Sequence, residues 1–173
     1  MDTLNPEPPA PPMIHPDKLL QTVAMVQDEN LDVRTITMGI NLLECAHDDE
    51  RELCRRVKDK VRRCAAPLVP VCEELGRKYG VPVVNKRLSV SPVADVAAGH
   101  SRDGCVAVAK ALDAAAAEVG VDFVGGYSAQ VEKGASSSDD ALLDSLPEAL
   151  CETEKICASV NVASTRAGVN MDA

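Results

Sequence analysis

Four runs rich in β-branched residues alternate with helical patterns, and this alternation restricts the fold more than any other feature of the sequence. The predicted strands cover residues 33–38, 81–90, 121–124 and 157–163. Strands that are joined through helices pair in parallel. The sequence therefore predicts an α/β fold of parallel βα units.

Apolar residues at helical spacing predict a helix over residues 16–27 and a long one that starts near residue 48. In the second segment Pro67 and Pro70 predict a kink or a restart, since a proline inside a helix costs about 3 kcal/mol. Gly80 then ends the segment.

The second half of the chain continues the pattern. An Ala-rich helix is predicted over residues 103–119, and two shorter helices over residues 142–146 and 148–156. Ser145 and Glu148 have the spacing of a capping box for the second of these. The last residues, 168–173, are typical of the entrance to another helix.

Four strands are too few to close a barrel of the usual eight, and an open sheet leaves edge strands unpaired. We therefore expect about half of a barrel over residues 17–173, incomplete at its C-terminal end, with a missing C-terminal half or a partner subunit covering the edge. Six prolines between residues 5 and 16 predict a disordered tail over residues 1–16.

Composition excludes several classes of protein. A formal net charge of −9 and 2% aromatic residues argue against nucleic-acid binding. No apolar run is long enough for a membrane span, and no secretory signal is present. Seven cysteines without a C-x-x-C pair predict free thiols in the cytoplasm, most of them in the core, and no metal site. Asp48 and Asp49 are expected to cap a helix rather than to join Cys45 and His47 around a metal.

In βα folds the chemistry lies where strands run into helices. Small and polar residues follow each predicted strand, among them the pair Gly125 and Gly126, which is taken as the end of the third strand. Cys45 is the candidate nucleophile, and Lys86 or Arg87 the candidate anion clamp. The other candidate ligand-binding residues are Asn41, Asn85, Ser128, Asn161, Ser164, Thr165 and Asp172.

Four long motifs resemble the uncharacterised-protein family two-ten, a domain of unknown function also called the PFL family protein group. They cover residues 31–45, 81–92, 121–129 and 146–173. The resemblance implies a fold similar to that of pyruvate formate-lyase, with this chain as the N-terminal part of a longer protein. Glycyl-radical chemistry does not carry over, because the chain has neither adjacent cysteines nor the C-terminal radical glycine.

Two functions stay open on this basis. The first is the binding of a small polar or anionic ligand at the carboxyl ends of the strands, with the reaction and any cofactor unassigned. The alternative is a non-catalytic regulatory or assembly module that acts through its exposed sheet edge and Pro-rich tail.

Overall fold

The computed structural model describes residues 15–28 and 32–172, in two compact units, Met1–Asp32 and Val33–Ala173. In the first unit α1 covers Pro16–Gln27, with the bounds that the sequence predicts and Pro16 in its first turn. Most of the predicted Pro-rich tail lies outside the described residues. The elements of the second unit are β1 (Val33–Ile40), η1 (Leu43–Cys45), α2 (Glu50–Ala65), α3 (Leu68–Tyr79), β2 (Val83–Val90), α4 (Val93–Val96), α5 (Arg102–Val119), β3 (Phe123–Gln130), α6 (Ser137–Glu152), β4 (Ile156–Asn161), β5 (Ala163–Ser164) and β6 (Gly168–Val169).

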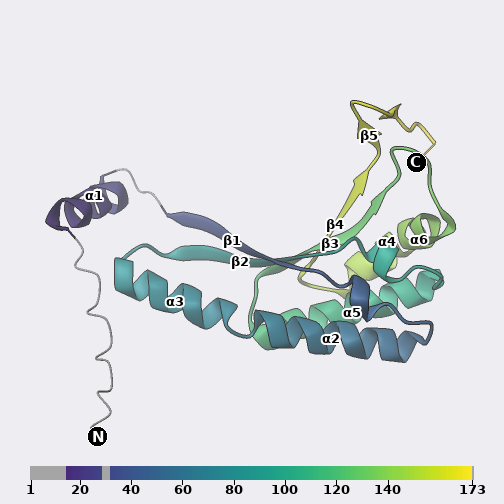
Figure 1. Ribbon diagram of the computed structural model, residues 1–173, viewed down its shortest axis with the longest axis horizontal. Coiled ribbons are helices and arrows are strands. Elements are labelled where there is room, and N and C mark those ends of the chain that lie inside the picture. The colour runs from purple at the N-terminus through teal and green to yellow at the C-terminus, as the bar shows by residue number, and fades with distance from the viewer. Residues whose placement is uncertain (1–14, 29–31, 173) are drawn as a thin grey trace, which may run out of the picture. The chain divides into compact units, whose positions relative to one another are not determined.

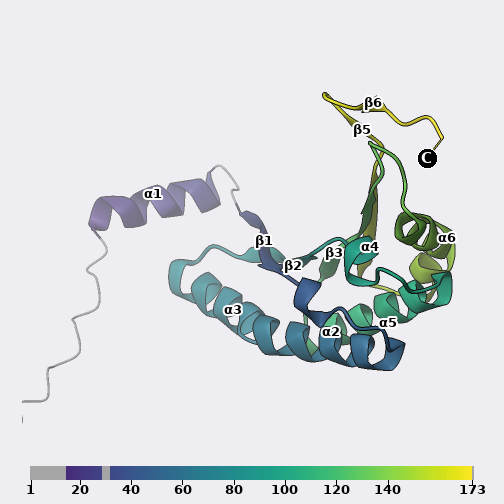
Figure 2. The ribbon, with the colours of Figure 1, turned by 45° about the vertical axis from the view of Figure 1, so that its right-hand side comes forward.

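The second unit contains one four-stranded sheet in the order β1-β2-β3-β4, with every neighbouring pair parallel. The predicted α/β class is confirmed. The helices that connect the strands lie together along one face of the sheet, as Figures 1 and 2 show for α2, α3 and α5. A parallel sheet with helices on one face only has the arrangement of a barrel wall.

The core lies between this sheet face and the helices. Leu88, Val124 and Tyr127 from the sheet are buried against Leu53 and Leu112 from α2 and α5. The phenol of Tyr127 lies 2.5 Å from the hydroxyl of Ser145 in α6, so the largest buried side chain keeps a polar partner. Burial raises the pKa of Tyr127 to about 12, although the contact with Ser145 acts in the opposite direction.

The helix break at the two prolines is confirmed. α2 ends at Ala65 and α3 begins at Leu68, with Pro67 as its N-cap residue. Pro70 is the third residue of α3, in the first turn, where a backbone N–H has no intrahelical partner and its loss costs little. Asp49 caps α2 as predicted, since its side chain accepts a hydrogen bond of 2.8 Å from the N–H of Glu52.

Three local predictions are wrong. α6 is a single helix that continues through Pro147, and its capping box is formed by Ser136 and Asp139 instead of Ser145 and Glu148. The prediction used a capping-box spacing that occurs by chance inside the helix, where Ser145 is fully buried against Tyr127. The residues after β4 form a two-stranded antiparallel hairpin, β5 with β6, and not a helix entrance.

The third wrong prediction concerns Gly125 and Gly126, which lie inside β3 and do not end it. Gly126 has a φ of 113° and occupies a register shift between β3 and β4. A Cβ built there would lie 2.4 Å from the carbonyl oxygen of Val90, so no side chain fits. The strand therefore passes through this point as a bulge and continues to Gln130.

Candidate functional site

Within residues 33–172, the sheet face opposite the helices is polar and largely exposed, and we call it the open face. Alternation places on it every second residue of β4, of β1 from Thr35 and of β2 from Asn85, and the same holds for β3 on each side of the bulge at Gly126. The residues between them pack on the helices. Its members are Thr35, Thr37, Gly39, Asn85, Arg87, Ser89, Phe123, Gly125, Ser128, Gln130, Cys157, Ser159 and Asn161.

A cavity of about 320 Å³ lies on the open face around Arg87. Register places Thr37, Arg87 and Phe123 side by side on β1, β2 and β3. The next row contains Ser89, Gly125 and Cys157, which also line the cavity. Hydroxyl, thiol and guanidinium groups therefore line one cavity, and Gly125 at its base has no side chain to fill it.

Arg87 is held by stacking rather than by an ion pair. Its Cζ atom lies 5.2 Å from the centre of the Phe123 ring, within the range of a cation–π contact. Within residues 15–28 and 32–172, no carboxylate forms an ion pair with Arg87. A guanidinium that is oriented by a ring and not neutralised is suited to binding a carboxylate or phosphate.

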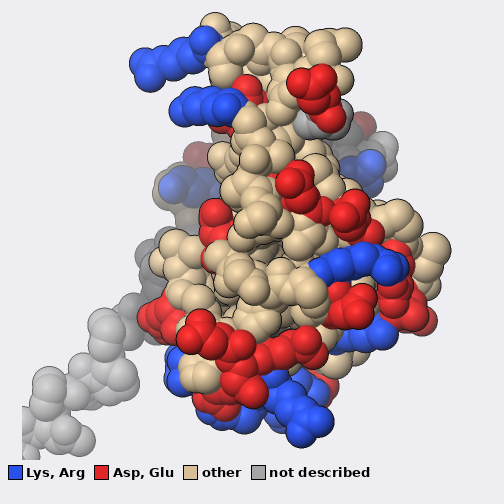
Figure 3. Space-filling model, turned by 90° about the vertical axis from the view of Figure 1, so that its right-hand side faces the viewer, with Lys and Arg blue, Asp and Glu red and all other residues tan. Residues whose placement is uncertain are grey.

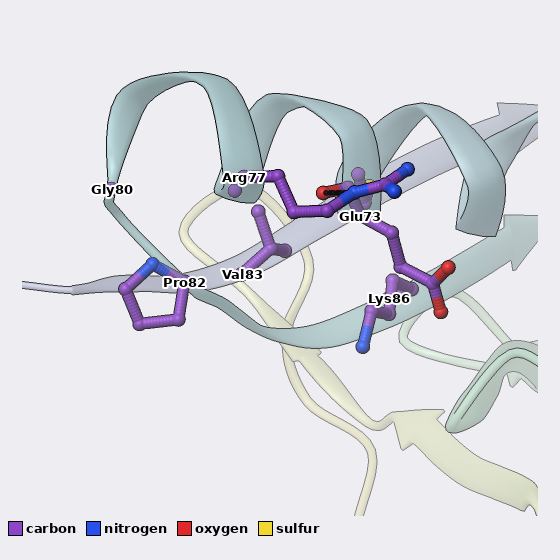
Figure 4. Close-up of a pocket in the computed structure, with 8 residues that line it drawn as sticks. Glu73, Arg77, Gly80, Pro82, Val83 and Lys86 are labelled. Atoms are coloured by element: carbon purple, nitrogen blue, oxygen red, sulfur yellow. Dashed lines mark hydrogen bonds between the residues drawn. The ribbon is translucent and has the colours of Figure 1, made fainter.

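Lys86 lies on the other side of the sheet, since consecutive strand residues point to opposite faces. It lines a crevice of about 520 Å³ between β2 and the C-terminal part of α3. Figure 4 shows Glu73 and Arg77 of α3 above Pro82 and above Val83 and Lys86 of β2. The predicted choice of Lys86 or Arg87 as one anion clamp therefore separates into two places.

Cys45 is buried at the end of η1, with a third cavity of about 360 Å³ beside it. Four basic residues line that cavity, but most of them are already paired. Lys60 contacts Glu44 at 2.7 Å, and Arg55 contacts Asp59 at 2.8 Å. Burial raises the pKa of the Cys45 thiol, although nearby Lys60 acts in the opposite direction. A raised pKa reduces the thiolate fraction at neutral pH, and the role of Cys45 as a nucleophile stays a prediction.

At the carboxyl end of the sheet, two polar side chains from different strands meet. The Ser91 hydroxyl donates to Asn41 Oδ1 at 3.1 Å and accepts from the N–H of Leu42 at the same distance. Asn41 Oδ1 also accepts from the N–H of Leu43. These bonds satisfy the turn that leads from β1 into η1, so Asn41 has a structural task here.

The remaining predicted residues do not join Asn41. Asn85 donates to the carbonyl of Arg34 on β1, and Ser128 donates to the carbonyl of Gly126. Asn161 donates to Glu132 at 3.3 Å. Ser164, Thr165 and Asp172 lie in or after the β5–β6 hairpin, away from the row that contains Arg87.

Acidic residues lie in the first turns of the helices that begin at this same end of the molecule. They are Glu50 and Glu52 in α2, Asp103 in α5, and Asp139 and Asp140 in α6. Figure 3 views this end and shows many acidic side chains over it. Their negative potential makes the end unfavourable for an anion compared with the cavity at Arg87.

Sequence reasoning missed Thr37, Ser89 and Cys157 as site residues. The alternation in residues 33–38 already placed Thr37 on the face opposite the core. Ser89 lies two residues after Arg87 in the same strand, so its side chain points to the same face as Arg87. The contact of Cys157 with this cavity depends on the β3–β4 register, which the sequence alone does not give.

Within residues 15–28 and 32–172 there is no group of three or more His, Cys, Asp or Glu side chains that could hold a metal ion. No helix in this part of the chain is long and apolar enough to cross a membrane.

Comparison with known proteins identifies similar sequences over nearly the whole chain. Residues 24–173 match the family model described as "Uncharacterised ACR (DUF711)". A UPF0210 protein of Desulforudis audaxviator (strain MP104C) is 55% identical over 93% of this chain and 36% of its own length. A UPF0210 protein of Desulfovibrio desulfuricans is 54% identical over 93% of this chain and 35% of its own length. The chain thus spans about a third of the length of these curated relatives, and the predicted resemblance to uncharacterised-protein family two-ten is confirmed.

Proposed function

Since the chain belongs to the DUF711 family, also called UPF0210, we propose that its open sheet face binds a small anionic ligand, a carboxylate or a phosphate, through Arg87. This moves the expected ligand from the carboxyl ends of the strands to the middle of the open face. The observation that carries the proposal is a guanidinium that lies in a cavity, stacks on Phe123 and has no ion-pair partner within the described residues.

The surroundings of Arg87 support this class of ligand. Thr37 lies opposite Arg87 on β1, and Ser89 lies two residues after Arg87 on β2. Both offer hydroxyl donors to the cavity that contains Arg87. Gly125 opens the floor, because a Cβ there would meet only the carbonyl oxygen of Leu88, at 3.9 Å. Positive charge together with neutral donors favours an oxyanion over a cation or an apolar molecule.

Isothermal titration of the chain with malonate and with inorganic phosphate tests the proposal. Hydrogen bonds to charged groups contribute about 1.5–3 kcal/mol, so Arg87→Met should weaken binding about 10- to 100-fold. Arg87→Lys keeps the charge and loses the planar pair of donors. We therefore expect its affinity for the anion to lie between those of the unaltered chain and of Arg87→Met.

Arg166→Met is the matched control, since Arg166 is also exposed and lies in the β5–β6 hairpin. It removes the same charge from the same chain and should leave binding unchanged. Equal weakening by Arg87→Met and Arg166→Met would show only an effect of net charge, and the proposal would fail. Failure of both anions to bind the unaltered chain would also count against it.

A further inference from the structure

The crevice between α3 and β2, at about 520 Å³, is larger than the cavities at Cys45 and Arg87, and the open face does not include it. Cys72 and Gly76 of α3 form one wall, and Pro82 and Val83 form the other. In Figure 4 the side chain of Val83 points toward α3. The crevice remains open because Gly76 has no side chain to fill it.

Apolar surface continues outward from the crevice. Val71, Leu75 and Tyr79 follow one another at four-residue spacing along α3, and they are between 40% and 48% exposed. Such side chains beside a cavity of this size offer an apolar molecule a place out of water.

The charge at the crevice is positive on balance. Lys86 and Arg77 line it together with Glu73 as its acidic residue. Arg77 Nε donates to the Glu73 backbone carbonyl at 3.4 Å, and no described carboxylate forms an ion pair with Lys86. An ammonium group at the end of an apolar wall matches a molecule with a carboxylate at one end and a hydrocarbon chain at the other.

We infer that the crevice between α3 and β2 binds a small apolar monocarboxylate, with its carboxylate on Lys86 and its hydrocarbon chain along Cys72, Gly76 and Val83. This site is separate from the one proposed at Arg87, because the two side chains lie on opposite faces of the sheet. Each site can therefore fail without the other.

Titration of the isotope-labelled 173-residue chain with octanoate, followed by amide chemical shifts, tests the inference. Shifts should map to the residues of the crevice. Burial of one CH₂ contributes about 0.8 kcal/mol, so affinity should rise by up to about fourfold per CH₂ from butanoate to octanoate. Octylamine, with the opposite charge, should bind at least about tenfold more weakly.

Two variants separate the carboxylate contact from the apolar contact. Lys86→Met keeps the length of the side chain and should weaken octanoate binding about tenfold. Lys78→Met removes the same charge from α3 outside the crevice and should have no effect. Gly76→Leu should abolish binding because its side chain would fill the crevice, and its thermal midpoint, measured in parallel, shows that the variant is folded; a Cβ at Gly76 meets nothing closer than 3.5 Å.

These outcomes decide the inference. The inference is supported if octanoate binding is saturable, shifts the amides of the crevice residues, is weakened by Lys86→Met and is unchanged in Lys78→Met. Absence of binding, equal binding of octylamine, or binding that Gly76→Leu leaves intact would overturn it. Malonate binding that depends on Arg87 would still support the proposed function in each of those cases.

Discussion

Gly126 is the position at which a single added methyl group should damage this fold most, and its neighbour supplies the control. Its φ of 113° is one that residues with a side chain rarely adopt. Alanine there would also place its Cβ 2.4 Å from the Val90 carbonyl oxygen and 2.7 Å from Val90 Cγ2. Backbone strain of about 1–3 kcal/mol and overpacking of about 1–3 kcal/mol together predict a loss of about 2–6 kcal/mol.

Urea unfolding, followed by circular dichroism, measures this loss as a lower midpoint at unchanged slope. Gly125→Ala places the same methyl group one residue earlier, where the nearest atom is 3.9 Å away and φ is not positive. We expect it to change the free energy of unfolding by less than about 1 kcal/mol. A loss for Gly126→Ala no larger than that for Gly125→Ala would refute the bulge and, with it, the shifted register beyond Gly126, in which Tyr127 pairs with Ala158.

Three other predictions follow from single contacts. Asp49→Ala should lower the free energy of unfolding by about 1 kcal/mol because it removes the N-cap of α2, whereas a similar loss in Asp48→Ala, measured in the same urea series, would argue against the cap. The pKa of Tyr127 is raised to about 12 in the fold from about 10 in the unfolded chain, so its contribution is complete below pH 10 and is lost as pH rises toward 12; thermal midpoints of Tyr127→Phe should therefore fall less than those of the unaltered chain over that window. With a thiol reagent at pH 8, the exposed Cys151 and Cys157 should react at once, and Cys105, whose pKa burial raises to about 11, should react only on unfolding; mass spectrometry that finds Cys105 labelled as fast as Cys157 would contradict its burial.

Sequence reasoning succeeded where local chemistry determines the structure. The bounds of α1, the restart at Pro67 and the cap at Asp49 each depend on residues within one or two turns. Parallel pairing was also predictable, because strands joined by helices can hardly pair otherwise.

It failed where a distant contact overrides a local preference. A Gly-Gly pair such as Gly125 and Gly126 is typical of a turn, yet β3 stays paired with β4 and continues through Gly126. Pro147 should interrupt a helix, but Leu142, Ser145 and Ala149 on either side of it are buried and hold α6 together. The prediction of the candidate site failed for the same reason. Strand alternation separates Lys86 from Arg87, and only the register brings Ser89 and Cys157 into one cavity.

The contrast between the two sheet faces limits what can cover the open one. A sheet that is packed with side chains on both faces has continuous apolar strands. This sheet is apolar toward the helices, as at Leu88 and Val124, whereas the open face presents hydroxyls, amides and Arg87, with Phe123 under the guanidinium. The curated relatives extend well beyond the matched region. If additional chain covers this face in them, it would have to offer Arg87 an acceptor or leave room for a ligand, because a buried charge without a partner costs several kcal/mol.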